Sequence, residues 1–144
     1  MMMRKSLMVV ASAMVLAGSF AAKAQSDGRT VWDGTYSAAQ ATRGKAVYAA
    51  NCAMCHGETL AGIDVAPPLV GSAFLNNWNS TTTADLFTRI HDTMPLNNPG
   101  SLGGRSVSDV EAYIFQMNGF PAGTIDLPPN PAMMGTTKIL STKP

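Results

Sequence analysis

The sequence contains few charged side chains and no long run of one sign. Charged residues make up 13% of the 144, with ten basic side chains against nine acidic ones. Proteins that bind nucleic acid or an anionic membrane surface carry clustered lysine and arginine. The scarcity of charge therefore argues against both kinds of partner and leaves proteins and small molecules as candidates.

Cysteine and histidine are also scarce, with two of each. Both cysteines and one histidine fall within residues 51–57, NCAMCHG, as Cys52, Cys55 and His56. A disulfide between residues this close would close a very small loop and add little stability. The two thiols are therefore not the staple that a small secreted domain commonly needs.

No segment shows the alternation of apolar and polar side chains that indicates a strand. Helical patterns cover 37–56, 84–93, and a stretch from Ser106 or Ser108 to residue 117. Ser37 is a candidate N-cap, with Gln40 placed to complete a capping box. Proline and glycine predict loops over 57–78 and 94–104 and a tail from 120 that lies over the surface. We therefore predict an all-α domain with long loops.

The N-terminus has the pattern of a secretory signal peptide. Arg4 and Lys5 precede an apolar run over 7–22, and Ala22 and Ala24 flank a cleavage position. The alternative, a retained membrane anchor, requires a longer apolar run. Cleavage after Ala24 would remove three basic residues and leave seven against nine acidic ones, a net charge of −2. The predicted division is 1–24 signal peptide, 25–36 arm, 37–123 domain and 124–144 tail, with a periplasmic location.

Three chemistries suit the Cys-x-x-Cys-His motif. A redox disulfide of the thioredoxin type requires a sheet-containing fold and has no use for His56. A zinc site of Cys52, Cys55, His56 and His91 would require two neighbouring residues to bind one ion. A covalent haem c uses all three residues of the motif. The cysteines, one helical turn apart, can bond the haem vinyl groups, and His56 can bind the iron.

A second axial ligand would decide between electron transfer and an open iron site. Met94 is the candidate, because it follows a predicted helix and precedes Pro95, which restrains the residue before it to an extended form. His91 is the rival ligand. Met54 lies inside the motif and is too close in sequence to cross the ring, Met117 fits the apolar stripe of the last helix, and Met133 and Met134 lie in the tail.

Residues 42–123 resemble a class I cytochrome c. The landmarks are Gly44 with Tyr48, CAMCH, APPLVG at 66–71, and TMP at 93–95 followed by a helix with AYI at 112–114. The resemblance implies a small all-α fold of three to five helices around one haem, with His56 and Met94 on the iron. It also implies that Tyr113 meets the Gly44 face.

The same resemblance implies several supporting roles. The carbonyl of Pro67 would accept the second ring N–H of His56, with Pro68 as the alternative. Trp78 and Arg89 are candidates to contact the haem propionates; otherwise Trp78 packs in the core and Arg89 lies on a solvated helix face. The chain would then be an electron carrier rather than an enzyme. The alternative is a ligand-binding or peroxidase-like protein with a labile sixth site.

A narrower resemblance concerns the partner. APPLVGSAFLNNW, TMPLNNPGSL and AYIFQMNGFPAG are similar to segments of single-haem cytochromes associated with periplasmic quinoprotein dehydrogenases. The resemblance implies an alcohol or sugar dehydrogenase using pyrroloquinoline quinone (PQQ) as donor. The acceptor would be a terminal oxidase or another cytochrome of the respiratory chain. We expect a weakly charged, largely apolar contact around the haem edge.

Overall fold

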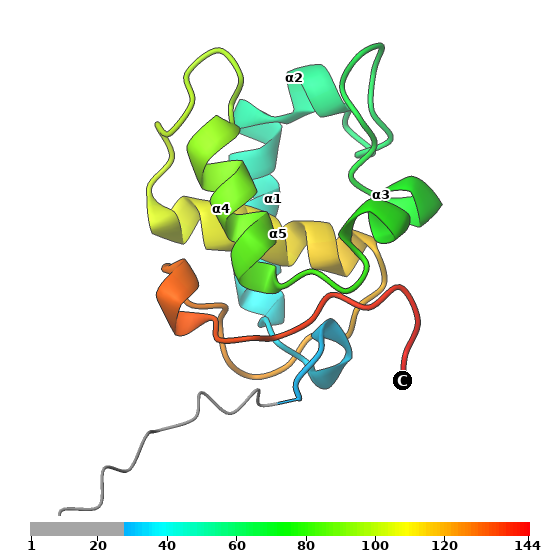
Figure 1. The fold of residues 1–144 in the computed structure, drawn as a ribbon. Coiled ribbons are helices and arrows are strands. Elements are labelled where there is room, and N and C mark those ends of the chain that lie inside the picture. Colours follow the sequence, from blue (N-terminus) through cyan, green and yellow to red (C-terminus); the bar gives the residue numbers. More distant parts are fainter. Residues whose placement is uncertain (1–27) are drawn as a thin grey trace, which may run out of the picture.

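The structure is a computed structural model that describes residues 28–144. In this range it has five α-helices, two short 3-10 helices and no strand (Figure 1). The helices are η1 (Val31–Asp33), α1 (Ala38–Asn51), α2 (Ala53–His56), α3 (Gly71–Trp78), α4 (Thr83–Thr93), α5 (Gly104–Met117) and η2 (Pro131–Met133). The predicted all-α fold of three to five helices is confirmed. The predicted signal peptide lies outside the described residues.

No helix within residues 28–144 combines the length and the apolar character that crossing a membrane requires.

The helices place the motif at one end of the molecule and the N-terminal arm with the C-terminal tail at the other. Figure 1 shows α2 at the top of the view, flanked by the loops over 57–70 and 94–103. The N-terminal arm and the C-terminal tail lie at the bottom. Helices α1 and α5 cross between these ends and make the most extensive helix–helix contact in the described chain.

The crossing of α1 and α5 depends on Gly44. A Cβ atom at this position would lie 1.7 Å from the Asp109 carbonyl oxygen and 3.0 Å from the Tyr113 Cβ. The missing side chain therefore lets the two backbones approach closely. Tyr113 also packs against Tyr48 of α1, with ring centroids 5.5 Å apart. The expected meeting of Tyr113 with the Gly44 face is present.

Gly44→Ala is expected to destabilise the fold by about 3 kcal/mol, because the added methyl group meets α5 backbone rather than a movable side chain. Denaturant unfolding monitored by circular dichroism measures this loss. Gly103→Ala is the matched control: Gly103 has a negative φ of −67° and open space where its Cβ would lie. Equal stability losses in the two variants would contradict the crossing argument.

Helix starts follow the capping chemistry of the sequence, with one difference. The Ser37 side chain accepts a hydrogen bond from the Gln40 backbone N–H (3.0 Å), and Thr82 with Asp85 forms a capping box at α4. The Gln40 side chain does not complete a box with Ser37. It instead donates to the Leu127 carbonyl (3.1 Å) and accepts from the Leu127 N–H (2.7 Å). Gln40 thus anchors the tail to α1.

Two predicted boundaries are wrong. Residues 71–78, predicted as loop, form α3, in which Phe74 is buried. The proline-rich stretch before it ends at Gly71, whose φ of +75° redirects the chain into a helix. Helix α5 begins at Gly104 rather than at Ser106 or Ser108, because no side chain caps it and Gly103 takes the N-cap position. Met117, predicted as core, is 42% exposed at the end of α5.

The tail is part of the core rather than a surface cover. Leu127, Met134 and Ile139 are buried. The tail backbone bonds the N-terminal arm through Lys138 N–H to the Arg29 carbonyl (2.9 Å), and it bonds α4 through Thr83 N–H to the Thr137 carbonyl (3.0 Å). These apolar anchors are spaced among prolines and glycines without a helical or strand period. Periodicity therefore could not reveal them.

Candidate haem-binding site

The Cys-x-x-Cys-His motif occupies the turn where α1 passes into α2. Cys52 caps the end of α1 and the start of α2. Its carbonyl accepts hydrogen bonds from the backbone N–H groups of Cys55 (3.1 Å) and His56 (2.9 Å). This turn keeps the two cysteines one helical turn apart, with Cys52 half-buried and Cys55 exposed. Both thiols are free, as attachment to a haem requires.

The imidazole of His56 is held in one tautomer. His56 is 8% exposed, and its Nδ1 lies 2.9 Å from the Pro67 carbonyl oxygen. A carbonyl oxygen can only accept, so Nδ1 carries the hydrogen and Nε2 keeps its lone pair. Pro67, rather than Pro68, supplies the carbonyl. His56 therefore has the form of a metal-binding imidazole.

The loop after His56 is fixed by hydrogen bonds that the sequence did not predict. The Tyr48 hydroxyl donates to the Gly57 carbonyl (2.6 Å), and the Gly62 N–H donates to the His56 carbonyl (2.8 Å). Burial raises the pKa of Tyr48 well above its usual value, so its hydroxyl stays protonated as a donor. Tyr48 stood out only as a landmark beside Gly44. Nothing in its spacing indicated a bond to the motif.

Asn118 closes the far end of this loop. Its amide nitrogen donates to the Leu69 carbonyl (2.9 Å), and its amide oxygen accepts from the Gly71 N–H (3.0 Å). Asn118 also caps the end of α5. It thus ties the Pro67-bearing loop to α5, and no sequence signal marked it for this role.

Met94 follows α4 directly, as expected. Its backbone is extended (φ −122°, ψ 154°), its N–H donates to the Ile90 carbonyl (3.0 Å), and the Met94–Pro95 bond is cis. The side chain is half-buried against the core. Met94 is therefore neither exposed like Met54, 86% exposed, nor enclosed like Met134, 5% exposed.

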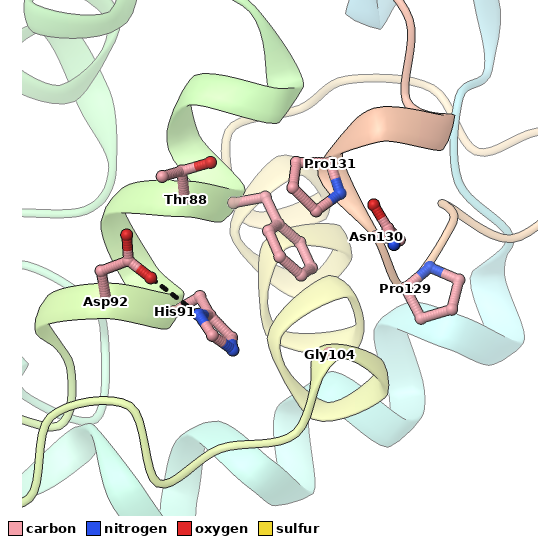
Figure 2. Close-up of a pocket in the computed structure, with 8 residues that line it drawn as sticks. Thr88, His91, Asp92, Gly104, Pro129, Asn130 and Pro131 are labelled. Atoms are coloured by element: carbon pink, nitrogen blue, oxygen red, sulfur yellow. Dashed lines mark hydrogen bonds and ion pairs between the residues drawn. The ribbon is translucent and has the colours of Figure 1, made fainter.

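His91 faces a different part of the molecule. It lines a hollow of about 470 Å³ with Phe87, Gly104 and Pro129 to Pro131 (Figure 2). Its ring stacks on Phe87 with centroids 5.8 Å apart, and its Nδ1 lies 2.8 Å from the Asp92 carboxylate. This hollow shares no residue with the motif, Pro67 or Met94. It is therefore not the haem site.

The two proposed propionate contacts differ in setting. Trp78, at the end of α3, is half-buried and packs against Phe74 with centroids 6.3 Å apart. Arg89 is exposed on α4. The structure records no contact of either side chain with the motif.

The residues present fit a haem better than the two alternatives. The two loops that flank α2 in Figure 1 carry half-buried apolar side chains that pack against the core: Leu69, Val70, Met94 and Leu102. Residues 28–144 contain no group of three or more His, Cys, Asp or Glu side chains that could hold a metal ion, which argues against zinc.

The state of Cys52 also argues against a redox disulfide. Burial, with the neighbouring Cys55, raises the pKa of the Cys52 thiol to about 11. A catalytic redox cysteine has a lowered pKa that favours the thiolate.

Comparison with known proteins agrees with this geometry. The sequence profile of the family described as "Cytochrome C oxidase, cbb3-type, subunit III" matches residues 39–114, just over half of the chain. The chain belongs to this cytochrome c family. The match spans α1 to α5 and includes the motif, Pro67 and Met94. The class I c-type cytochrome assignment is thus confirmed, and the protein is a haem protein of electron transfer.

Other comparisons add little. No curated protein matches the chain. The structure titled "Crystal Structure of the Sulfane Dehydrogenase SoxCD from Paracoccus pantotrophus" is similar at 20% identity and a TM-score of 0.46. The match covers 77% of this chain and 59% of that one. A TM-score this low carries no argument about function.

Proposed function

We propose that the cytochrome is a periplasmic electron carrier with one haem bonded to Cys52 and Cys55 and with His56 and Met94 as axial ligands. The observation that carries the proposal is the hydrogen bond from His56 Nδ1 to the Pro67 carbonyl, 2.9 Å long. This bond leaves the lone pair of Nε2 available to bind the iron, and it fixes the plane of the ring. Such a bond also makes a ligating imidazole more basic.

The chain's own residues have defined tasks in this proposal. Pro67 orients the imidazole, while Tyr48 and Asn118 hold the loop that carries Pro67. Met94 supplies a neutral sulfur from an extended residue at the end of α4. Bound here, the haem supplies a one-electron iron couple. A methionine–histidine pair raises its reduction potential relative to two histidines.

Trp78 and Arg89 are the two candidates to contact the haem propionates. Trp78 has an indole N–H and is half-buried, so it can donate to a carboxylate at the edge of the site. Arg89 is exposed on α4, a setting that suits a solvated guanidinium. We propose Trp78 as the stronger candidate of the two.

The visible spectrum of protein exported with a haem-maturation system tests the proposal. Covalent haem with the weak charge-transfer band of a thioether on ferric iron supports an electron carrier. Covalent haem without this band favours the alternative, a ligand-binding or peroxidase-like protein. A colourless protein would refute the haem site.

The proposed donor is a PQQ-dependent alcohol or sugar dehydrogenase, and the proposed acceptor a terminal oxidase or another cytochrome. The narrower sequence resemblance supports this pair, and the signal-peptide pattern supports the periplasm. Exposed apolar side chains near the motif suit docking with little charge: Met54, Ile63, Val65 and Leu96. Val65 is 98% exposed, and a partner that buried this side chain completely would gain roughly 1.5–3 kcal/mol.

The rate of electron transfer to a soluble acceptor protein is expected to change less than about threefold between low and physiological salt. Residues 25–144 contain only Lys45, Lys138 and Lys143, so no lysine ring exists for salt to screen. Stopped-flow mixing at several salt concentrations measures this rate. Val65→Ser is expected to slow transfer, and Ile125→Ser, at a position in the tail that is 73% exposed, is the control. A steep decrease with salt would contradict apolar docking.

A further inference from the structure

The methionines of residues 28–144 differ widely in how far solvent reaches them. Met54 is 86%, Met133 68% and Met117 42% exposed, whereas Met134 is 5% exposed. Met94 is half-buried. An oxidant must reach the thioether to convert it to the polar sulfoxide. Met54 is therefore the methionine of the described chain that is most accessible to such an oxidant.

Met54 faces away from the residues proposed to hold the haem: Cys52, Cys55 and His56. An α-helix turns about 100° per residue, so these three residues fall within roughly 100° of arc, and Met54 lies roughly 100° or more from each of them. The burial agrees, because His56 is 8% and Met54 86% exposed. A haem bonded on the side of the three residues therefore leaves Met54 in contact with solvent.

Met54 also belongs to the exposed apolar patch proposed for docking, with Ile63, Val65 and Leu96. Backbone hydrogen bonds fix one loop of this patch beside the motif. The Gly62 N–H donates to the His56 carbonyl (2.8 Å), and the Ala66 N–H donates to the Ile63 carbonyl (2.9 Å). Among the four side chains of the patch, only the methionine has an atom that mild oxidants convert to a polar group.

We propose that Met54 is a site of reversible oxidation that controls docking of the redox partner, an inference that rests on the proposed function. Hydrogen peroxide is the oxidant. The sulfur attacks one peroxide oxygen, an S–O bond forms as the O–O bond breaks, and the proton of the transferred oxygen passes to the leaving hydroxide, which departs as water. Sulfur loses two electrons and peroxide gains them. A thiol-dependent sulfoxide reductase reverses the change, with two thiols oxidised to a disulfide and the oxygen released as water.

Oxidation of Met54 places a polar oxygen within the apolar patch. A partner that docks there would bury this oxygen, and burying a polar atom without a hydrogen-bond partner is unfavourable, so the second-order rate of electron transfer is expected to fall about tenfold. Met133 is also exposed, but it lies in η2 at the opposite end of the molecule from α2 (Figure 1). Its oxidation should leave the rate unchanged.

The test treats the holoprotein with hydrogen peroxide, removes the excess with catalase, and locates the added oxygen by mass spectrometry of peptides. Stopped-flow mixing then measures electron transfer to a soluble blue-copper protein. Met54→Leu keeps an apolar side chain that cannot form a sulfoxide, and Met133→Leu is the matched control. Compared with its own untreated sample, the rate should fall in the unmodified protein and in Met133→Leu but not in Met54→Leu. Methionine sulfoxide reductase with a dithiol should restore it.

Ferricyanide is a small oxidant that needs no apolar docking, so its reaction rate should not change on treatment. A parallel loss of the ferricyanide rate, an equal loss in Met54→Leu, or an unchanged rate with Met54 fully oxidised would overturn the proposal. Peptides in which Met54 stays unoxidised would also overturn it. A haem spectrum that lacks the thioether band before treatment would instead refute the proposed function, and the peptide map would still decide whether Met54 is oxidised.

Discussion

Met94→Leu is expected to remove the thioether charge-transfer band of the ferric cytochrome and to lower its reduction potential. Leucine keeps the volume of the side chain but has no donor atom, so the iron would lose one ligand. Axial ligands set haem potentials over a range of ≈ 0.8 V, and exchanging methionine for water or another ligand is expected to cost on the order of 0.1–0.3 V. Visible spectroscopy and protein-film voltammetry measure the two effects.

Met117→Leu is the control for this experiment. Met117 is 42% exposed at the end of α5, so removing its sulfur should leave both the band and the potential unchanged. If the band persists in Met94→Leu, another residue is the ligand, and His91→Gln becomes the variant to examine. The His91 ring would first have to leave Phe87 and Asp92.

The parts of the site that could be predicted are those encoded within a few residues of one another. Cys52, Cys55 and His56 lie on one helical turn because their spacing leaves no other arrangement in a helix. Ser37 caps α1, as predicted, because a short hydroxyl side chain can reach the N–H three residues on. The predicted partner of His56, Pro67, came from the resemblance, since the two residues lie eleven positions apart in the sequence with loop between them.

The parts that could not be predicted depend on contacts between distant segments. Helix α3 is short and follows two prolines, so local patterns favoured a loop. The Asn118 side chain and the Leu127 backbone form hydrogen bonds with residues far away in the sequence. Such bonds leave no periodic pattern that could predict them. The burial of the tail could not be predicted for the same reason. Its apolar side chains become buried only when α4 and the arm, which lie far away in the sequence, have folded against them.

Glu111 is an ionisable residue at a fully buried position, where apolar side chains are usually found. It is 0% exposed, and both of its carboxyl oxygens lack a hydrogen-bond partner among residues 28–144. On α5 it shares a face with Val107 and Phe115, both fully buried. It does not line the hollow described above. Burial raises the pKa of Glu111 well above its ordinary value of 4.5, so the group is held as a neutral acid.

The stability of the cytochrome is therefore expected to fall as pH rises above about 4.5. The folded chain keeps the Glu111 proton to a higher pH than the unfolded chain does, so raising the pH favours unfolding until the folded group itself ionises. The expected slope is up to about 1.4 kcal/mol per pH unit. Glu111→Gln cannot ionise, so its stability should change less with pH over this interval.

Denaturant unfolding of the holoprotein from pH 4 to pH 8 compares these profiles. Asp64→Asn is the control, because Asp64 is exposed and asparagine tolerates its positive φ of 49°. Glu111→Met should go further and stabilise the protein by about 1–3 kcal/mol even at low pH, because it removes an unsatisfied polar group. If Glu111→Gln and the unmodified protein lose stability in parallel, Glu111 ionises at its ordinary pKa. The site would then have to open to solvent, and the burial argument would be wrong.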